Sequence, residues 1–360
     1  MKLPIDVAAV INAATDLESA RTTPVSVSVL IDDTAPGDVA AHVRTAFLGA
    51  GSHARVTIGY FAGPAFEPYS GDDMAVIVAG TSEDVGARAA AIRAAGVPVM
   101  VVTSLPSLVG DLASAFGNPI PEGDLVAPKA PAPEQGDAAE TCGEAGAPAH
   151  AADSDPDTPI AIDEAAAASL DRRMGEWVVA ACREKRLALA LAFPFVRRPL
   201  SLEAVNATSL QNAGIGLVAF IPGADLPLMT LNQAKMLLQI AAAYGEPMSA
   251  ARAKELAAVV AGGVACRNVA REVAGVVPGV GWAVKAAVGY AGTFAMGQAA
   301  VEYFERGGNI SGLAGVVGVA TSKAAKVAAD VAATPAGSRV VGAAKSALRQ
   351  GAASILKKTE

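Results

Sequence analysis

The sequence predicts a small α/β domain with a parallel sheet, followed by an all-α domain rich in Gly and Ala. Three observations predict this class. Short apolar runs alternate with amphipathic helical patterns over residues 1–119, as in parallel sheets. Residues 120–159 are rich in Pro, Ala and acids and show no apolar period. Apolar runs of helical length then follow one another over residues 160–308, and a basic, Ala-rich helical tail occupies 309–360.

Composition limits the class of protein. Hydrophobic residues make up 52 % of the 360 residues, aromatic residues only 4 %, and the mean hydropathy is +0.39. This mixture suits helices that approach one another closely, in a soluble bundle or in a membrane. The three cysteines, Cys142, Cys182 and Cys266, form no CxxC pattern, so we expect neither a disulfide framework nor a zinc site. The first apolar run, between Asp6 and Asp16, is too short and too acidic for a signal peptide.

Charge is distributed unevenly along the chain. Residues 1–120 carry 6 Lys or Arg and 12 Asp or Glu, residues 121–159 carry 1 and 9, and residues 160–360 carry 21 and 14. The acidic front argues against nucleic acid as a partner. The basic rear fits an anionic membrane surface or an acidic protein partner.

The α/β domain is expected to open on a strand at 25–33, because this stretch first alternates and then runs continuously apolar. The helix expected at 82–96 has Ser82 as a candidate N-cap and Gly96 as its left-handed stop. The remaining expected elements are a helix at 35–48 and strands at 55–61, 72–80 and 97–106.

This pattern resembles a reduced G-domain, in which a strand ending in VIVAG leads through a helix to the strand that reads guanine. At that place the chain holds residues 103–106, TSLP, which offer no carboxylate to a guanine edge. A phosphate-binding P-loop needs the string GxxxxGK[ST], and the nearest approach, GSRVVGAAKS at 337–346, has two extra residues before its Lys. Asp32 and Asp33 follow the first strand and would repel phosphate. We therefore expect a partner-binding domain without catalytic, cofactor-binding or metal-binding residues.

Residues 120–159 are expected to be a disordered linker, because they cannot bury enough apolar surface to offset the entropy of ordering. After the linker, a long amphipathic helix should run to about Leu191 with Trp177 packed on its apolar face. The basic pairs at 185–186 and 197–198 bracket the run LALALAFPFV. This run is too short to span a bilayer, so it forms either a membrane-interface segment or a buried helix end.

Residues 204–234 contain a single charge, Asp225, and are interrupted by Gly and Pro, which predicts two short helices joined by the sequence PGADLP. Thr230 and Gln233 have the spacing of a capping box, so a helix is expected to begin at Thr230. Gly245 should end that helix in the left-handed conformation.

The helix expected at 280–306 carries a stripe of small residues that lets a neighbouring helix approach closely. The stripe recurs at multiples of four and consists of Gly281, Gly289, Thr293 and Gly297.

Lys285 falls on the same stripe, and residues 273–301 form a membrane candidate with this Lys as the only charge. Inside a membrane the Lys should face an interior, a cavity or an acid such as Asp225 or Glu302. In a soluble bundle it would reach solvent instead. The candidate residues for helix packing and a polar core are Asp225, Lys285, Gly289, Thr293, Gly297 and Tyr303.

The central helical stretch resembles the bacterial domain-of-unknown-function family 697, over about residues 185–306. The resemblance rests on a Pro-Asp entry, an apolar helix ending in Tyr-Gly, and a P-x-x-G…T-x-x-x-G-x-A-x-x-x-Y pattern. The matching positions are Pro222, Asp225, Tyr244, Gly245, Pro278, Gly281, Thr293, Gly297, Ala299 and Tyr303. The resemblance implies membrane association and a domain that often follows an Era-like GTPase domain, and it implies no activity.

Three functions follow as alternatives. The first is a non-catalytic protein of the cytoplasmic membrane, with the α/β domain facing the cytoplasm and membrane lipid as a partner. The second is a soluble cytoplasmic scaffold whose helical bundle binds proteins. The third is a GTPase-like nucleotide switch with degenerate motifs. A protein partner is expected but not identified, and a homo-oligomer is one of the forms it could take.

Overall fold

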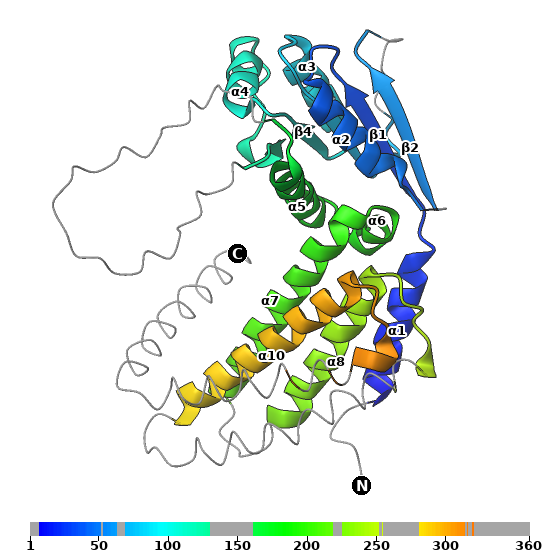
Figure 1. Cartoon of the computed structure of the whole chain (residues 1–360), viewed down its shortest axis with the longest axis vertical. Coiled ribbons are helices and arrows are strands. Elements are labelled where there is room, and N and C mark those ends of the chain that lie inside the picture. The colour runs from blue at the N-terminus through cyan, green and yellow to red at the C-terminus, as the bar shows by residue number, and fades with distance from the viewer. Residues whose placement is uncertain are drawn as a thin grey trace, which may run out of the picture. The chain divides into compact units, whose positions relative to one another are not determined.

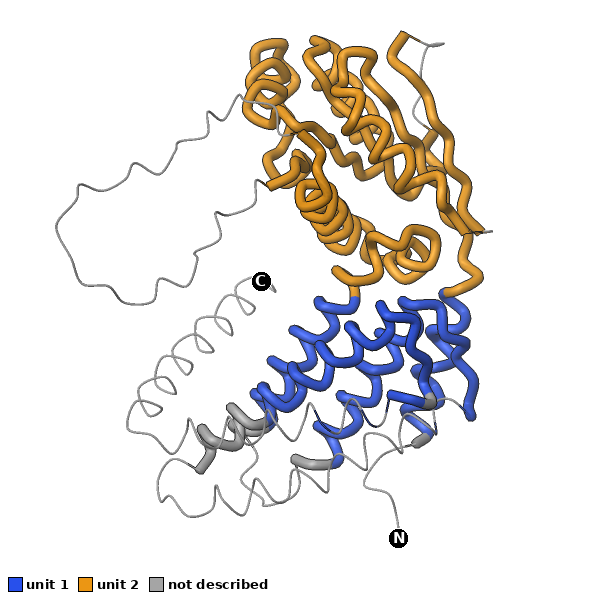
Figure 2. The backbone as a smooth tube through the Cα atoms, viewed as in Figure 1, with its two compact units in different colours: residues 1–20, 201–360 blue, residues 21–200 orange. Residues whose placement is uncertain are grey.

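The computed structural model describes residues 7–51, 53–62, 69–129, 161–218, 225–251, 254, 281–313, 315 and 319. The chain divides into two compact units (Figure 2). We call residues 21–200 the sheet unit, and residues 1–20 with 201–360 the helical unit. This division differs from the ranges expected from the sequence, since the sheet unit extends to Leu200 and the helical unit includes the amino terminus.

The sheet unit contains five parallel strands in the order β2-β1-β3-β4-β5 (Figure 1). The expected α/β class is therefore confirmed. The central strands are buried on both faces of the sheet and are largely apolar, although the first of them also contains Ser26 and Ser28. The strands are β1 (Val25–Ile31), β2 (Ala54–Tyr60), β3 (Met74–Val78), β4 (Val99–Val102) and β5 (Leu125–Val126).

One face of the sheet is covered by α3 (Asp84–Ala94) and α4 (Pro106–Ala115). Ile77, Val101 and Ile92 are among the residues at the centre of this layer. Gly96 ends the α3 segment with a φ of +81°, which confirms the expected left-handed stop.

The opposite face carries α2 (Gly37–Leu48), α5 (Glu164–Ala181) and α6 (Arg186–Ala192). Phe47 of α2 packs against Phe193 and Phe195, with ring centroids 4.9 Å and 5.2 Å away. Successive side chains of a strand point to opposite faces of the sheet, so each helical layer packs against every second side chain of the central strands.

Two expectations about this region need correction. The helix expected to run to Leu191 stops at Ala181, and a turn separates it from α6. The linker expected at 120–159 is ordered at its start, where a 3₁₀ turn, η1 (Glu122–Asp124), leads into β5. Val126 is buried and pairs with Val102, so even a two-residue apolar pair completes the sheet. Residues 130–159 lie outside the described part of the chain.

The helical unit is built from α1 (Val7–Arg21), the part of α7 (Pro194–Val218) from Ser201 on, α8 (Asp225–Ala243) and α10 (Gly281–Glu305). A 3₁₀ turn, η2 (Ile310–Gly312), follows α10. The expected helix at 280–306 is thus confirmed. Within the described residues, no helix is both long enough and apolar enough to cross a membrane.

Two local expectations in this unit differ from the structure. The helix expected at Thr230 begins at Asp225, so Thr230 lies inside α8 and does not cap it. Gln233 donates its side-chain amide to the Thr293 hydroxyl of α10 instead. The glycines near 214 do not break α7, which continues to Val218. Gly245 does have the expected left-handed backbone, with a φ of +88°.

Candidate functional site

The first place to search for a site is the carboxyl edge of the sheet between β1 and β3. The connection that follows β1 and the connection that follows β3 leave toward opposite faces of the sheet here, and parallel sheets of this strand order hold ligands at such a switch point. Asp32 follows β1, and Gly80 lies two residues beyond the end of β3. These two residues define the candidate site.

The Asp32 carboxylate is 2 % exposed and is surrounded by donors. It accepts hydrogen bonds from the backbone N–H of Gly80 at 2.8 Å, of Ser82 at 3.3 Å and of Thr34 at 3.0 Å. The Thr34 hydroxyl donates a further bond at 2.9 Å. The backbone amides that such an edge offers to an anionic ligand are therefore bound to an anion of the chain itself.

The loop that follows β1 and the loop that follows β3 are also in contact at this edge. A Cβ placed on Gly80 would lie 2.3 Å from the backbone carbonyl atoms of Thr34, so only Gly fits there. Thr81 donates its backbone N–H to the Thr34 hydroxyl at 2.7 Å. A ligand could reach these amides only by separating the loops.

The neighbouring strand β4 is followed by Thr103 and Ser104, both buried. The Thr103 hydroxyl accepts the backbone N–H of Leu105 at 3.1 Å, while the Ser104 hydroxyl has no hydrogen-bond partner among the described residues. Within the described ranges, no cluster of His, Cys, Asp and Glu could hold a metal ion.

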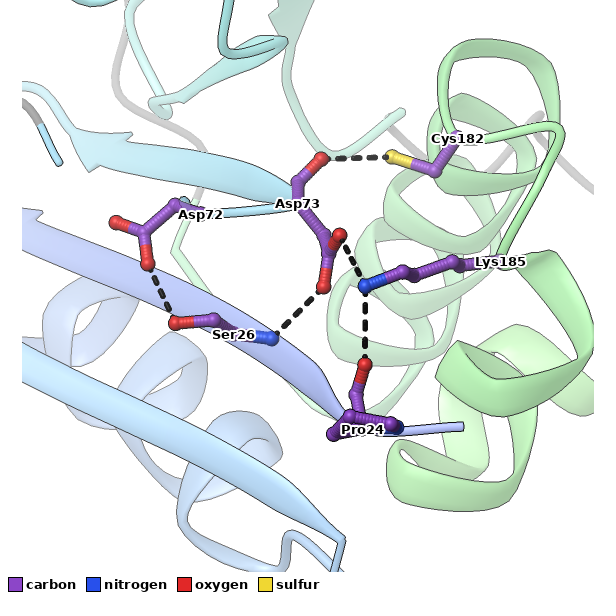
Figure 3. A network of polar contacts seen from close by, with 6 residues as sticks. All are labelled: Pro24, Ser26, Asp72, Asp73, Cys182 and Lys185. Atoms are coloured by element: carbon purple, nitrogen blue, oxygen red, sulfur yellow. Dashed lines mark hydrogen bonds and ion pairs between the residues drawn. The ribbon is translucent and has the colours of Figure 1, made fainter. Parts of the chain in front are cut away.

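A second polar network lies at the amino edge of the sheet (Figure 3). Lys185, in the turn between α5 and α6, forms a 2.7 Å ion pair with Asp73 and donates to the Pro24 carbonyl at 3.0 Å. Asp73 also accepts the backbone N–H of Ser26 at 2.9 Å, and its neighbour Asp72 accepts the Ser26 hydroxyl at 2.6 Å.

Burial decides between the two alternatives for the run LALALAFPFV, which lies between the two basic pairs. Ala188 and Leu189 are buried, so the run is a helix end packed in the sheet unit. Arg197 donates to the Ala190 carbonyl at 3.1 Å.

Cys182 donates to the Asp73 carbonyl at 3.8 Å, and burial, followed by the Asp73 charge, raises the pKa of its thiol to about 12. The thiol is therefore protonated at neutral pH and poorly nucleophilic.

In the helical unit, a buried polar cluster joins α7, α8 and α10. The Thr293 hydroxyl accepts from Asn212 at 3.0 Å and from Gln233 at 2.8 Å, and it donates to the Gly289 carbonyl at 2.7 Å. Asn232 donates to the Asn212 side-chain oxygen at 3.1 Å. Every hydrogen-bonding position of the Thr293 hydroxyl is thus in use.

The small-residue stripe packs against α7 on both sides of this cluster. A Cβ on Gly289 would lie 3.2 Å from the Asn212 carbonyl, and one on Gly297 would lie 2.4 Å from a Val205 methyl group. The structure thus brings Gly289, Thr293 and Gly297 together on one helix contact.

The other predicted residues lie apart from this contact. Tyr303 stacks edge-on against Phe304 and fills the space beside Gly308 and Gly312. Asp225 begins α8 and Lys285 lies in α10, but the side chains of both are outside the described part of the structure.

Sequence reasoning missed the roles of Asp32 and Asn212. The sequence predicts Asp32 only as a charge that repels phosphate. An acid directly after a buried strand can also accept hydrogen bonds from the backbone of a neighbouring loop. Asn212 gave a weaker signal as an amide within an apolar helical run. Comparisons of the chain with known protein families, curated proteins and solved structures found no match.

Proposed function

We propose that this chain is a non-catalytic, membrane-associated protein. The sheet unit, as a reduced G-domain-like fold, is a binding module for a protein partner in the cytoplasm. The helical unit, as an all-α domain related to the family it resembles, attaches the chain to the cytoplasmic membrane.

One observation supports the non-catalytic part most strongly. The Asp32 carboxylate already accepts the backbone amides of Gly80 and Ser82, which are the donors that a nucleotide phosphate would use. A phosphate carries the same charge as the carboxylate, so binding would require removing a buried Asp from four hydrogen-bond donors. These hydrogen bonds support a sheet unit that binds a protein partner and no nucleotide.

Calorimetric titration of the full chain with GTP, GDP and ATP in the presence of Mg²⁺ tests this part. We expect no binding heat for any of the three. A dissociation constant in the micromolar range for one of them would overturn the non-catalytic proposal and favour the nucleotide switch.

The membrane part is supported by the apolar, Gly-rich and Ala-rich composition of residues 204–320 and by the basic tail that follows. Between Ser322 and Lys358 the chain carries seven Lys or Arg and a single acid, Asp330. Such a charge balance favours contact with anionic lipid.

Cell fractionation tests the membrane part. We expect the full chain in the membrane pellet, released by a non-ionic detergent, and we expect the purified chain to float with phosphatidylglycerol vesicles. Recovery in the supernatant together with failure to float would contradict membrane attachment.

The soluble scaffold is a second candidate, and a specific observation favours it. The small-residue stripe of α10 is buried against α7 of the same chain, which is what a tightly packed soluble bundle requires. A full chain that is monodisperse without detergent and stays in the supernatant would select this candidate.

A further inference from the structure

The strand β2 forms one edge of the sheet and pairs only with β1 among the described strands. Its side chains are exposed or half-buried, in contrast to the buried β1, β3 and β4. Tyr60, at its end, is a large side chain that is 45 % exposed. Natural edge strands are commonly blocked by charged side chains, Pro, a bulge or a short length; this seven-residue strand has a single charge, Arg55, and neither Pro nor a bulge.

The backbone groups that β2 directs outward follow from its pairing with β1. The His53 carbonyl accepts from Val25, and the Phe61 N–H donates to Ile31. Alternate residues of a parallel strand face the same neighbour, so the odd-numbered residues between these two face β1. Val56, Ile58 and Tyr60 consequently point their N–H and C=O groups away from the sheet, where no described strand meets them.

The side chains of β2 are self-complementary when the strand pairs antiparallel with a second β2 around Thr57. On one face, Thr57 would lie opposite Thr57 of the second copy, and Arg55 would lie opposite Gly59. On the other face, Val56 would lie opposite Ile58, and Ala54 opposite Tyr60. Thr–Thr and β-branched apolar pairs stabilise antiparallel strands, and no like charges meet in this register.

The register also matches the free backbone groups. Val56 faces Ile58, and Tyr60 faces Ala54, so outward-pointing residues meet outward-pointing residues along the strand; the Ala54 N–H is already used, since it donates to the Gly51 carbonyl at 3.0 Å. About six backbone hydrogen bonds can form across the two-fold axis. A shift of one residue between the strands sets outward-pointing residues against residues that face β1. Moving the two-fold axis by one residue sets Val56 or Ile58 against itself and leaves one end of β2 unpaired.

We propose that two copies of this chain associate through β2. The two strands pair antiparallel around Thr57 and so join the two five-stranded sheets into one continuous sheet. The contact is isologous, because the same strand serves both copies. It requires neither a ligand nor attachment to a membrane, so it stands or falls independently of the proposed function.

The mass of the full chain in solution is the first test. Size-exclusion chromatography with light scattering should give twice the mass of one 35.9 kDa chain at high protein concentration, in non-ionic detergent if extraction requires it. The variant Ile58→Pro removes an N–H that points outward, and its ladder with β1 stays complete, so we expect one-chain mass. Ile58→Val keeps the N–H and should remain dimeric.

Cross-linking tests the register directly and does not depend on the Pro variant folding. In a background with Cys142→Ser and Cys266→Ser, a Thr57→Cys variant places two Cα atoms about 4.5 Å apart across the axis, within disulfide range. Non-reducing electrophoresis should show a dimer that disappears on reduction. Arg55→Cys is the matched control, because its two copies would lie about 14 Å apart along the strands and should stay uncoupled.

Three results would overturn the proposal. They are a one-chain mass for the unmodified protein at all concentrations, a dimer that persists in Ile58→Pro, and a failure of Thr57→Cys to cross-link while Arg55→Cys does so.

Discussion

His42 is a residue whose charge state responds to its packing. Its imidazole lies 2.7 Å from the Asp171 carboxylate, and this hydrogen bond raises its pKa above the usual 6.5, against the opposing effect of burial. The protonated form is therefore favoured in the folded chain. The pair joins α2 to α5 within the sheet unit.

A raised pKa in the folded state predicts the sign of the pH dependence. The stabilisation is fully present below pH 6.5 and is lost as the pH rises through the folded-state pKa. Because both side chains are partly exposed, we expect a loss below about 1 kcal/mol. Urea unfolding on both sides of neutrality measures it. Asp171→Asn should remove this pH-dependent part, and an unchanged slope in that variant would contradict the assignment.

Thr293 tests whether the buried polar cluster stabilises the helical unit. Thr293→Val keeps the shape but removes the buried hydroxyl that accepts from the amides of Asn212 and Gln233. We expect a loss of about 1–3 kcal/mol in the free energy of unfolding. Thr293→Ser keeps the hydroxyl and serves as the control in the same denaturant titration. Equal losses in both variants would assign the effect to the methyl group instead.

At the scale of elements, the contact between α7 and α10 is set by Gly297. Gly297→Ala would push a Cβ to 2.4 Å from Val205, a stiff and fully buried side chain. We expect a loss of about 1–3 kcal/mol from this overpacking, measured by thermal or urea unfolding.

Two variants control this prediction. Gly214 lies in α7 with open space around its Cβ position, so Gly214→Ala should be neutral or stabilising by up to about 1 kcal/mol. Val205→Ala should relieve Gly297→Ala, so that the double variant loses less than the sum of the two single ones. Additive losses would mean that the two positions do not touch.

The corner between α5 and α6 is fixed to the sheet by Lys185. Lys185→Met keeps the length of the side chain but leaves the Asp73 carboxylate without its ion pair. We expect a loss of about 1–2 kcal/mol in the free energy of unfolding, since the carboxylate is largely buried and the amine is partly exposed. Arg183→Met, in the same turn, should change it little, because Arg183 bonds only to the nearby Ala180 carbonyl among its described contacts.

Local signals predicted the elements better than they predicted the site. Apolar runs and glycine stops depend on neighbouring residues, so the strands and the left-handed turns at Gly96 and Gly245 could be read from the sequence. Asp32 meets Gly80 across 48 residues, and Asn212 meets Thr293 across 81. Such contacts depend on how distant segments fold together, which a local pattern does not contain.

The difference between local signals and distant contacts also explains why α8 does not begin at Thr230. Thr230 and Gln233 have the spacing of a capping box, yet Gln233 forms its hydrogen bond with Thr293 across 60 residues. Tertiary packing therefore outweighed the local capping signal. The expected break after residue 119 failed for a similar reason, because Leu125 and Val126 gain a place beside β4 that only the folded sheet provides.

At the scale of the whole molecule, both ends of residues 130–160 belong to the sheet unit. Lys129 donates its backbone N–H to the Ser169 hydroxyl at 3.1 Å, and Arg173 bonds to the Ala127 carbonyl. Trp177 donates to Asp124 at 3.2 Å. Strand β5 and helix α5 are thus joined by direct contacts, in addition to the chain between them.

A protease site inserted between residues 140 and 150 tests this arrangement. After cutting, we expect the two fragments to elute together from a size-exclusion column and to melt as one species, because the contacts between β5 and α5 remain. Cutting in denaturant and then diluting is the comparison that measures reassembly. Separation of the fragments under native conditions would show that the peptide connection itself holds the unit together.

The connection between Lys129 and Ala161 is also a position at which the gene can accept insertions or deletions. The entropy of closing a loop rises by only about 0.6 kcal/mol for each doubling of its length, so insertions or deletions here cost the folded chain little. A tag, a fluorescent domain or a second recognition motif could be carried at this position without moving β5 or α5. Reassembly of the two fragments would also mean that two open reading frames can encode what one encodes now.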